Sequence, residues 1–380
     1  MDNEVKVESP EKSSGKVWKT VKKLSKRWFI DAFSGMAQGL FVTLIAGTIL
    51  AQIAGWIGDN YFGNTLKYIA NIAKTLMGAG IGVGIAHALT KNKLLIFSCA
   101  VAGFVGAFAD KLIVGGTGLT AITLGTPGNP IGAYVCTLLA VEIVSLYAGK
   151  TKLDIILVPL GVLFLSFAGV FIAWPFIELV NLLGKVIAVA TEATPFFMGI
   201  IIAVIMGILL TMPTSSAAIW VAVAGPVLAS GTPNEIYYML LAGGAATVGC
   251  ACHMVGFAVA SFRENGVGGL IAQGLGTSML QIPNIMRKPI IMLPMIISSA
   301  ICGPLSTCVF GLLCGKSGGG MGTSGLVGVF EIIGASEINV LTIVGLILLM
   351  FVLPIVLNLL ISEFMRKKGW IKYGDMKLDV

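Results

Sequence analysis

Long apolar stretches alternate with short polar connections along almost the whole chain. In the first half, apolar stretches cover residues 32–57, 65–89, 94–114, 130–149 and 153–180. A helix needs about 20 apolar residues to cross the hydrocarbon layer of a bilayer, and each stretch is long enough. The pattern therefore predicts a series of transmembrane helices.

The second half is less regular. Pro213 interrupts the apolar pattern between residues 196 and 230, because proline removes a helical hydrogen bond. Longer spans are expected at 236–261, 289–313 and 339–363. Two glycine-rich segments, 267–282 and 315–337, are predicted to be re-entrant. The predicted fold class is an all-α polytopic membrane protein with about ten transmembrane helices and two re-entrant Gly-rich segments.

Basic residues predict the orientation in the membrane. The connections 90–93 and 149–152 contain lysines, whereas 58–64 and 115–129 contain neither lysine nor arginine. Positive charge marks the cytoplasmic side, so we expect a cytoplasmic N-terminus. An even number of crossings brings the C-terminus to the same side. The expected location is the bacterial cytoplasmic membrane.

Composition supports this interpretation and excludes nucleic acid as the partner of the basic groups. Hydrophobic residues make up 56% of the chain and charged residues 11%, far below a typical soluble domain. The net charge of +7 is concentrated at the two ends of the chain. Basic groups beside membrane spans attract anionic lipid, which is the expected partner.

Four regions follow from these patterns. Residues 1–30 are predicted to be a cytoplasmic leader and a basic amphipathic surface helix, because apolar residues recur at helical spacing between lysines over 16–30. Residues 31–190 form an N-terminal transmembrane half. Residues 191–365 form a C-terminal transmembrane half with the re-entrant segments, and 366–380 form a basic cytoplasmic tail.

One short motif occurs twice. Residues 274–280 (GLGTSML) and 320–326 (GMGTSGL) share the pattern G-x-G-T-S-x-L. Paired interrupted segments in a transporter point to the substrate site. The alternative is a recurrence caused by glycine-rich composition alone. The motif makes four hydroxyl residues candidates for binding a solute: Thr277, Ser278, Thr323 and Ser324.

Residues 247–284 carry an unusual number of polar groups, including His253 and Gln273. Ionisable groups are costly in a bilayer, so this stretch should line a cavity or a buried network. His253 can bind a hydroxylated solute or relay a proton; the alternative is a neutral histidine in helix packing. The triplet Arg263, Glu264 and Asn265 is either a self-neutralising pair with a turn, or a polar wall for a solute or anion.

A few further candidates lie elsewhere. Thr214, Ser215 and Ser216 follow the interrupting proline and are either helix N-caps or solute donors. Glu142 is an acid within a span; it is linked to a solute or proton, or it meets Lys150 or water. We find no metal-ligand spacing, no cofactor motif and no catalytic grouping, so no enzyme activity is expected of the chain by itself.

Several stretches resemble a known family. They are GNPIGAYV (128–135), GKTKLDIILVPL (149–160), TMPTSSAAI (211–219), SFRENGVGGLIAQGLGTSMLQIPNI (261–285) and GPLST (303–307). With these motifs, most of residues 30–365 is similar to the membrane-embedded enzyme IIC of bacterial sugar phosphotransferase systems. The similarity is to a divergent branch, labelled enzyme IIC type 2 or perfringolysin-regulator-like.

The resemblance implies a homodimeric permease whose N-terminal half is a scaffold and whose C-terminal half carries the solute. An intramembrane histidine and a glutamate hold the sugar in related permeases. His253 matches the histidine, and Glu264 is a candidate for the glutamate, although the acidic motif has no clear counterpart here. Phosphorylation-coupled transport would require separate IIA and IIB proteins.

Three functions remain as hypotheses. The first is a permease that translocates a small polar solute, such as a sugar or a related metabolite, by alternating access. The second is a secondary transporter of the same fold that uses an ion gradient without phosphoryl transfer. The third is a membrane-embedded solute sensor or regulator.

Overall fold

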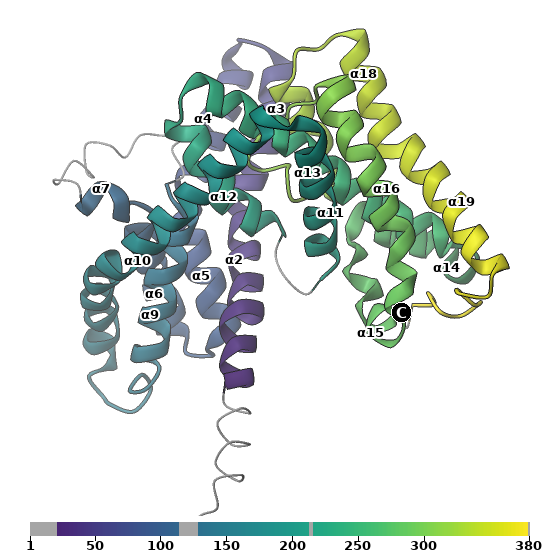
Figure 1. Cartoon of the computed structure of the whole chain (residues 1–380). Helices are drawn as coiled ribbons and strands as arrows, with labels where there is room; N and C mark the ends of the chain where they lie inside the picture. Colours follow the sequence, from purple (N-terminus) through teal and green to yellow (C-terminus); the bar gives the residue numbers. More distant parts are fainter. Residues whose placement is uncertain (1–20, 114–127, 213–215, 379–380) are drawn as a thin grey trace, which may run out of the picture.

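The computed structural model describes residues 21–113, 128–212 and 216–378 (Figure 1). Thr214 and Ser215 lie outside this range. The described chain is mostly helical and contains no strand, which confirms the predicted all-α fold class. The helices that build the first half are α2 (Ala32–Leu40), α3 (Ala46–Ile57), α4 (Tyr61–Thr75), α5 (Met77–Leu89), α6 (Lys93–Ala107), α7 (Ala109–Ile113), α9 (Pro130–Val144) and α10 (Asp154–Ala193).

The second half continues with longer helices and two interrupted regions. Its helices are α11 (Pro195–Thr211), α12 (Ser216–Ser230), α13 (Pro233–Ala260), α14 (Phe262–Ile271), α15 (Ile282–Arg287), α16 (Leu293–Pro304), α17 (Val327–Ala335), α18 (Val340–Ile347) and α19 (Leu353–Lys367). Short π-helical or 3-10 segments join several of them.

Five helical runs are long and apolar enough to cross a membrane: Val21–Ile57, Asp154–Ala193, Pro233–Ala260, Pro289–Phe310 and Val340–Lys367. A sixth possible span is the pair α4 and α5, which meet at a bend of 51°. Helices α6, α9, α11 and α12 are apolar but shorter. Each predicted span thus coincides with helix, and the number of crossings remains a prediction.

Two boundaries differ from the sequence-based expectation. The surface helix expected to end at residue 30 is not separate in the described part, because residues 21–57 form one continuous helical run. Helix α10 continues to Ala193, well past the expected end of its span at 180, although Pro159 and Pro175 lie within it. The extent of a hydrophobic stretch does not show where its helix begins or ends, because the helix continues into the residues beside that stretch.

Helices α2, α5, α6, α9 and α10 form the N-terminal bundle. This bundle lies on the left of Figure 1. Glycines at its helix crossings allow unusually close contact. A Cβ atom added at Gly35 of α2 would lie 2.4 Å from the carbonyl oxygen of Gly84 of α5, and one added at Gly84 would lie 2.1 Å from the carbonyl oxygen of Gly35. Small residues of this kind let membrane helices approach closely.

The C-terminal half places α13 at its centre. Helices α11, α16 and α19 pack around α13. In the most apolar 18-residue stretch of α13, 94% of the residues are buried. Helix α12 behaves differently, because Ala218 and Val221 belong to the core of the N-terminal bundle. Helix α12 therefore joins the two halves, and the candidate site lies beside it.

The glycine contact between α2 and α5 gives a stability prediction. Gly84→Ala should lower the free energy of unfolding by about 1–3 kcal/mol, because the new methyl group meets backbone that cannot move aside. Thermal unfolding of the purified protein measures the change. Gly55→Ala is the matched control, since no heavy atom lies within 4 Å of a Cβ at that position. Equal unfolding temperatures for the two variants would contradict the packing account.

Candidate functional site: a cleft between two glycine-rich segments

Both copies of the repeated motif lie in backbone that is not regular α-helix. The first copy covers a π-helical segment, Ala272–Gly276, an extended Thr277 and a 3-10 turn, Ser278–Gln281. The second copy covers turns that end in a short 3-10 segment, Ser324–Leu326. Leu326 has a φ of +59°, a strained conformation for a residue with a side chain. Interrupted backbone of this kind survives at membrane depth only when protein or water satisfies it.

The two copies bind each other directly. The Thr323 hydroxyl donates to the carbonyl of Gly274 at 2.6 Å, and the Ser324 hydroxyl donates to the carbonyl of Gly276 at 2.9 Å. The threonine and serine of the second motif thus pair with backbone that the first motif leaves without helical partners. The two copies of the motif therefore form one structural unit.

The first turn of α12 joins this unit. The Ser216 hydroxyl donates to the carbonyl of Gly320 at 2.6 Å. A Cβ atom added at Gly320 would lie 2.4 Å from the carbonyl oxygen of Ser216, so only glycine fits there. The N-terminus of α12 is consequently held against the second motif.

A cleft of about 590 Å³ lies where the two motifs, α12 and α2 meet. Its polar wall includes three residues that the sequence analysis selected: Ser216, Thr277 and Ser324. The rest of its wall is formed by Ile30, Ser34, Ala37, Gln38, Phe41, Leu210, Ala217, Met279, Ile282 and Met321. An apolar cleft with a few polar groups is the usual form of a small-molecule site. The lining residues that the structure describes offer hydroxyl and amide groups, which suit hydrogen bonding to a small polar molecule.

Sequence reasoning missed the contribution of α2. Ser34 and Gln38 lie one helical turn apart within an apolar span, and both reach the cleft. Their spacing of four residues was a usable signal, since it places both side chains on one helix face.

His253 does not line the cleft but lies behind it. The imidazole is fully buried, and its Nδ1 shares a hydrogen bond of 2.9 Å with the Thr211 hydroxyl. Thr211 also lies 3.1 Å from the carbonyl of Gly207 and 3.0 Å from the hydroxyl of Ser278. Because a hydroxyl has one proton, all three contacts are satisfied when Thr211 donates to Gly207 and accepts from His253 and Ser278. His253 Nε2 has no hydrogen-bond partner in the described chain.

Ser278 connects this buried group to the cleft, because it follows Thr277 in the chain. His253 therefore reaches the cleft wall through Thr211 and Ser278 rather than by direct contact. This is a more indirect position than the sequence analysis expected for His253.

Gln273 belongs to a second buried network. Its amide nitrogen donates to the Ser261 hydroxyl at 2.9 Å, and its oxygen accepts from Gln281 at 2.8 Å. Gln281 in turn accepts from Asn284 at 2.8 Å. Gln281 and Asn284 also donate to the carbonyls of Met376 and Lys377. The network thus supports the first motif and ends on the C-terminal segment, not in the cleft.

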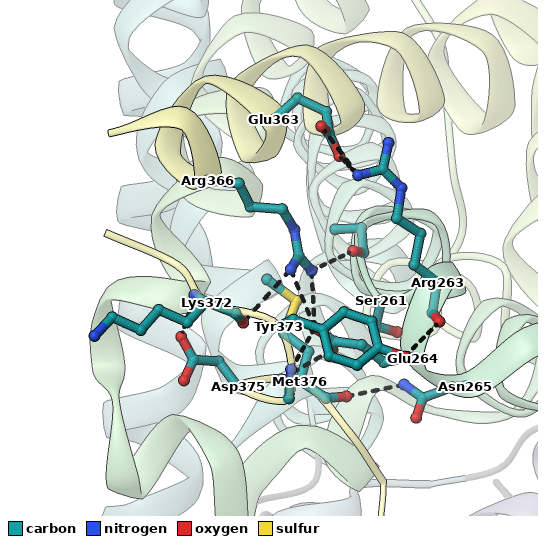
Figure 2. Close-up of polar contacts among 12 residues, drawn as sticks. Ser261, Arg263, Glu264, Asn265, Glu363, Arg366, Lys372, Tyr373, Asp375 and Met376 are labelled. Carbon is teal, nitrogen blue, oxygen red and sulfur yellow. Dashed lines mark hydrogen bonds and ion pairs between the residues drawn. The ribbon is translucent and has the colours of Figure 1, made fainter. Parts of the chain in front are cut away.

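The C-terminal segment, residues 368–378, folds back against Glu264 and Asn265 of α14 (Figure 2). It also meets α15, where Asn284 donates to the Lys377 carbonyl. Glu264 is its main anchor. The carboxylate of Glu264 pairs with Arg366 at 3.1 Å and accepts from the backbone amides of Gly374 and Met376 at 3.0 Å. The Glu264 side chain is 0% exposed and that of Arg366 is 11% exposed. A buried carboxylate with this many donors is a structural anchor.

Asn265 and Asp375 complete the attachment. Asn265 donates to the carbonyl of Met376 and accepts from the amide of Leu378, both at 2.8 Å. Asp375 pairs with Lys288 at 2.7 Å. Burial raises the pKa of Asp375, but hydrogen bonds from Lys288 and the Lys372 amide outweigh it, so the pKa is lower than usual. The tail, expected to be a simple basic extension, is a folded part of the molecule.

Two acidic residues have ion-pair partners other than those weighed among the alternatives of the sequence analysis. Arg263 does not neutralise Glu264; it pairs with Glu363 at 3.1 Å, while Glu264 pairs with Arg366 (Figure 2). Glu142 does not meet Lys150. It accepts from Arg27 at 2.6 Å and from the indole of Trp28 at 3.2 Å. The true partners are distant in the sequence, so local spacing could not identify them.

The fold and the cleft define a class of protein: a polytopic helical membrane protein whose candidate site lies between two interrupted segments, as in transporters. The family described as "Phosphotransferase system, EIIC" matches residues 30–378. The chain therefore belongs to the enzyme IIC family, the membrane permease components of sugar phosphotransferase systems. No curated protein and no solved structure was found to match the chain.

The buried anchor of the C-terminal segment gives a prediction. Glu264→Gln should weaken the attachment of residues 368–378 by about 3 kcal/mol, because it leaves Arg366 without its counter-charge. Limited proteolysis of the purified protein should then cut the tail at least tenfold faster. Arg263→Gln is the control, since the Arg263 side chain is 65% exposed and its ion pair contributes little. An unchanged cleavage rate in Glu264→Gln would contradict the anchoring role.

Proposed function

We propose that this enzyme IIC protein binds a small polar solute, a sugar or a closely related metabolite, in the cleft between its two glycine-rich motifs. Ser216, Thr277 and Ser324 are the residues that would hold the solute, with Ser34 and Gln38 of α2 on the opposite wall. Translocation would follow by alternating access of this cleft to the two sides of the membrane.

One observation carries the proposal. Hydroxyl residues from two distant copies of one motif, and from the first turn of α12, converge on one cleft. The Ser216 and Ser324 hydroxyls give their protons to backbone carbonyls and can accept from a sugar hydroxyl, whereas Thr277, which accepts from the Met279 amide, can still donate to one. A cleft volume of about 590 Å³ leaves room for a solute of this size.

Glu264, Asn265, Gln273, Thr323 and His253 have supporting roles in this proposal. Thr323 holds the two motifs together, and Glu264 and Asn265 hold the C-terminal segment. His253 positions Ser278 behind the cleft wall. The proposal thus divides the predicted site residues into those that contact the solute and those that shape the cleft. Arg263 and Glu142 take part only through their ion pairs.

The setting of the protein is part of the same proposal. The start of the first helical run and the C-terminal segment both lie in the lower part of Figure 1, and both are rich in lysine and arginine. This supports two cytoplasmic termini in a bacterial membrane, beside anionic lipid. Membership of the enzyme IIC family favours a homodimer and separate IIA and IIB proteins as phosphoryl donors.

The cleft residues give a binding prediction. Purified protein should be stabilised against heat by one or more members of a panel of neutral sugars and polyols, because a ligand of the folded state raises its stability. Ser324→Ala and Thr277→Val should each weaken this binding by about tenfold, the effect of one lost hydrogen bond to a bound ligand. Ser98→Ala is the control, because Ser98 lies in α6 and bonds only to the Leu94 carbonyl.

The panel also separates the remaining hypotheses. Sugar binding with phosphoenolpyruvate-dependent uptake supports the enzyme IIC mechanism, whereas uptake driven by a proton or sodium gradient supports a secondary transporter. Binding without any flux would identify a sensor. If no panel member binds, or if Ser324→Ala and Ser98→Ala bind equally well, the cleft is not the solute site.

A further inference from the structure

A second cavity of about 450 Å³ lies against the later turns of α12. Its wall comes from both halves of the chain: Met77, Asp110, Lys111, Gly128, Asn129, Pro130, Asn181, Val221, Gly225, Pro226, Ala229, Ser230 and Lys316. No residue of the first cleft is shared with it. The first cleft is mostly apolar, whereas this cavity combines two lysines, an aspartate, two asparagines and a serine.

Two side chains on this wall have unsatisfied oxygens. Asp110 Oδ1 and Asn181 Oδ1 are buried, and neither has a hydrogen-bond partner in the described chain. A buried acceptor without a donor costs about 1–3 kcal/mol. Such groups are rare in native proteins and call for a specific explanation. Both oxygens are shielded from the cavity, so a ligand hydroxyl would donate to them only after the carboxylate or amide group turns toward it.

The same wall also carries donors. Lys316 and Lys111 are the basic residues of this wall. Glu331 lies near enough to Lys316 to offset part of its charge. Donors and acceptors on one wall match a neutral polyhydroxylated molecule, because each hydroxyl can donate to Asp110 or Asn181 and accept from a lysine.

The two cavities share two structural elements. Helix α12 contributes Ser216 and Ala217 to the first cleft and, one turn later, Val221 and Gly225 to the second cavity. The glycine-rich stretch contributes Met321 and Ser324 to the first and Lys316 to the second.

One layer of contacts between α12 and the glycine-rich stretch lies, along the chain, between the residues that line the two cavities. Ser216 donates to the carbonyl of Gly320 within this layer. Trp220 packs there against Gly319 so closely that a Cβ at Gly319 would lie 2.1 Å from its indole nitrogen. That indole nitrogen is itself buried without a partner.

We infer that the Asp110–Lys316 cavity is a second binding site for a neutral polyhydroxylated solute, on the same route as the first cleft. This inference rests on the proposed function and extends it. Asp110 and Asn181 accept from the solute hydroxyls, and Lys316 donates to them. The layer formed by Ser216–Gly320 and Trp220–Gly319 is the barrier between the two sites, so passage from one to the other requires this layer to open.

The test introduces one cysteine at each site and measures how far a bound ligand slows the reaction of that cysteine with a thiol reagent. In a Cys308→Ser background, which removes the exposed native thiol, Ala37→Cys reports on the first cleft and Ser230→Cys on the second cavity. The purified full chain is labelled with a polar thiol reagent in the presence of the same panel of neutral sugars and polyols. The inference predicts that a panel member slows labelling at both positions in a saturable manner.

Asp110→Asn and Asn181→Leu should each weaken protection at position 230 by about tenfold, while protection at position 37 is retained. Asp59→Asn, at an exposed position before α4, is the matched control and should change neither. Thermal unfolding of each variant verifies that it is folded. Protection at 37 without protection at 230, or equal protection at 230 in Asp110→Asn and Asp59→Asn, would overturn the second site and leave the proposed function intact. Absence of protection at both positions would overturn the proposed function itself and the inference that rests on it.

Discussion

The hydrogen bonds from Thr323 and Ser324 to the carbonyls of Gly274 and Gly276 are the interaction on which the site depends. Backbone that leaves the helical path inside a membrane loses its own partners, and each unsatisfied group costs several kcal/mol in hydrocarbon. Here two interrupted segments satisfy each other, so neither is stable in this form without its counterpart. The cleft exists because the paired motifs hold open a space that regular helices would fill.

The rest of the molecule positions this pair of segments. Glycine crossings bring α2 against α5, which places Ser34 and Gln38 opposite the motifs. Ser216 fixes α12 to the second motif, and the Gln273 network with the C-terminal segment supports the first. Enzyme IIC proteins must move a solute through a membrane, and a site built from discrete hydrogen-bonded contacts can change partners without melting the surrounding helices.

The sequence predicted the fold class and the position of nearly every helix, because hydrophobic spans and basic connections are local signals. It also selected Ser216, Thr277 and Ser324 through the broken helix and the repeated motif. Other features could not be predicted, because they depend on contacts between residues about 100 positions apart. The pairing of Glu264 with Arg366 and of Glu142 with Arg27 belongs to this group. The burial of His253 behind Thr211 could not be predicted either, since a polar residue in a span does not reveal which neighbour it faces.

The central claim is that a sugar-like solute lies between the two motifs, and a structure of the protein with a bound panel member tests it most directly. The account predicts ligand density in contact with Ser216, Thr277 and Ser324, with His253 still bonded to Thr211 behind the wall. Density that contacts His253 directly while the Thr323–Gly274 and Ser324–Gly276 contacts remain closed, or density bound elsewhere in the C-terminal half, would contradict it.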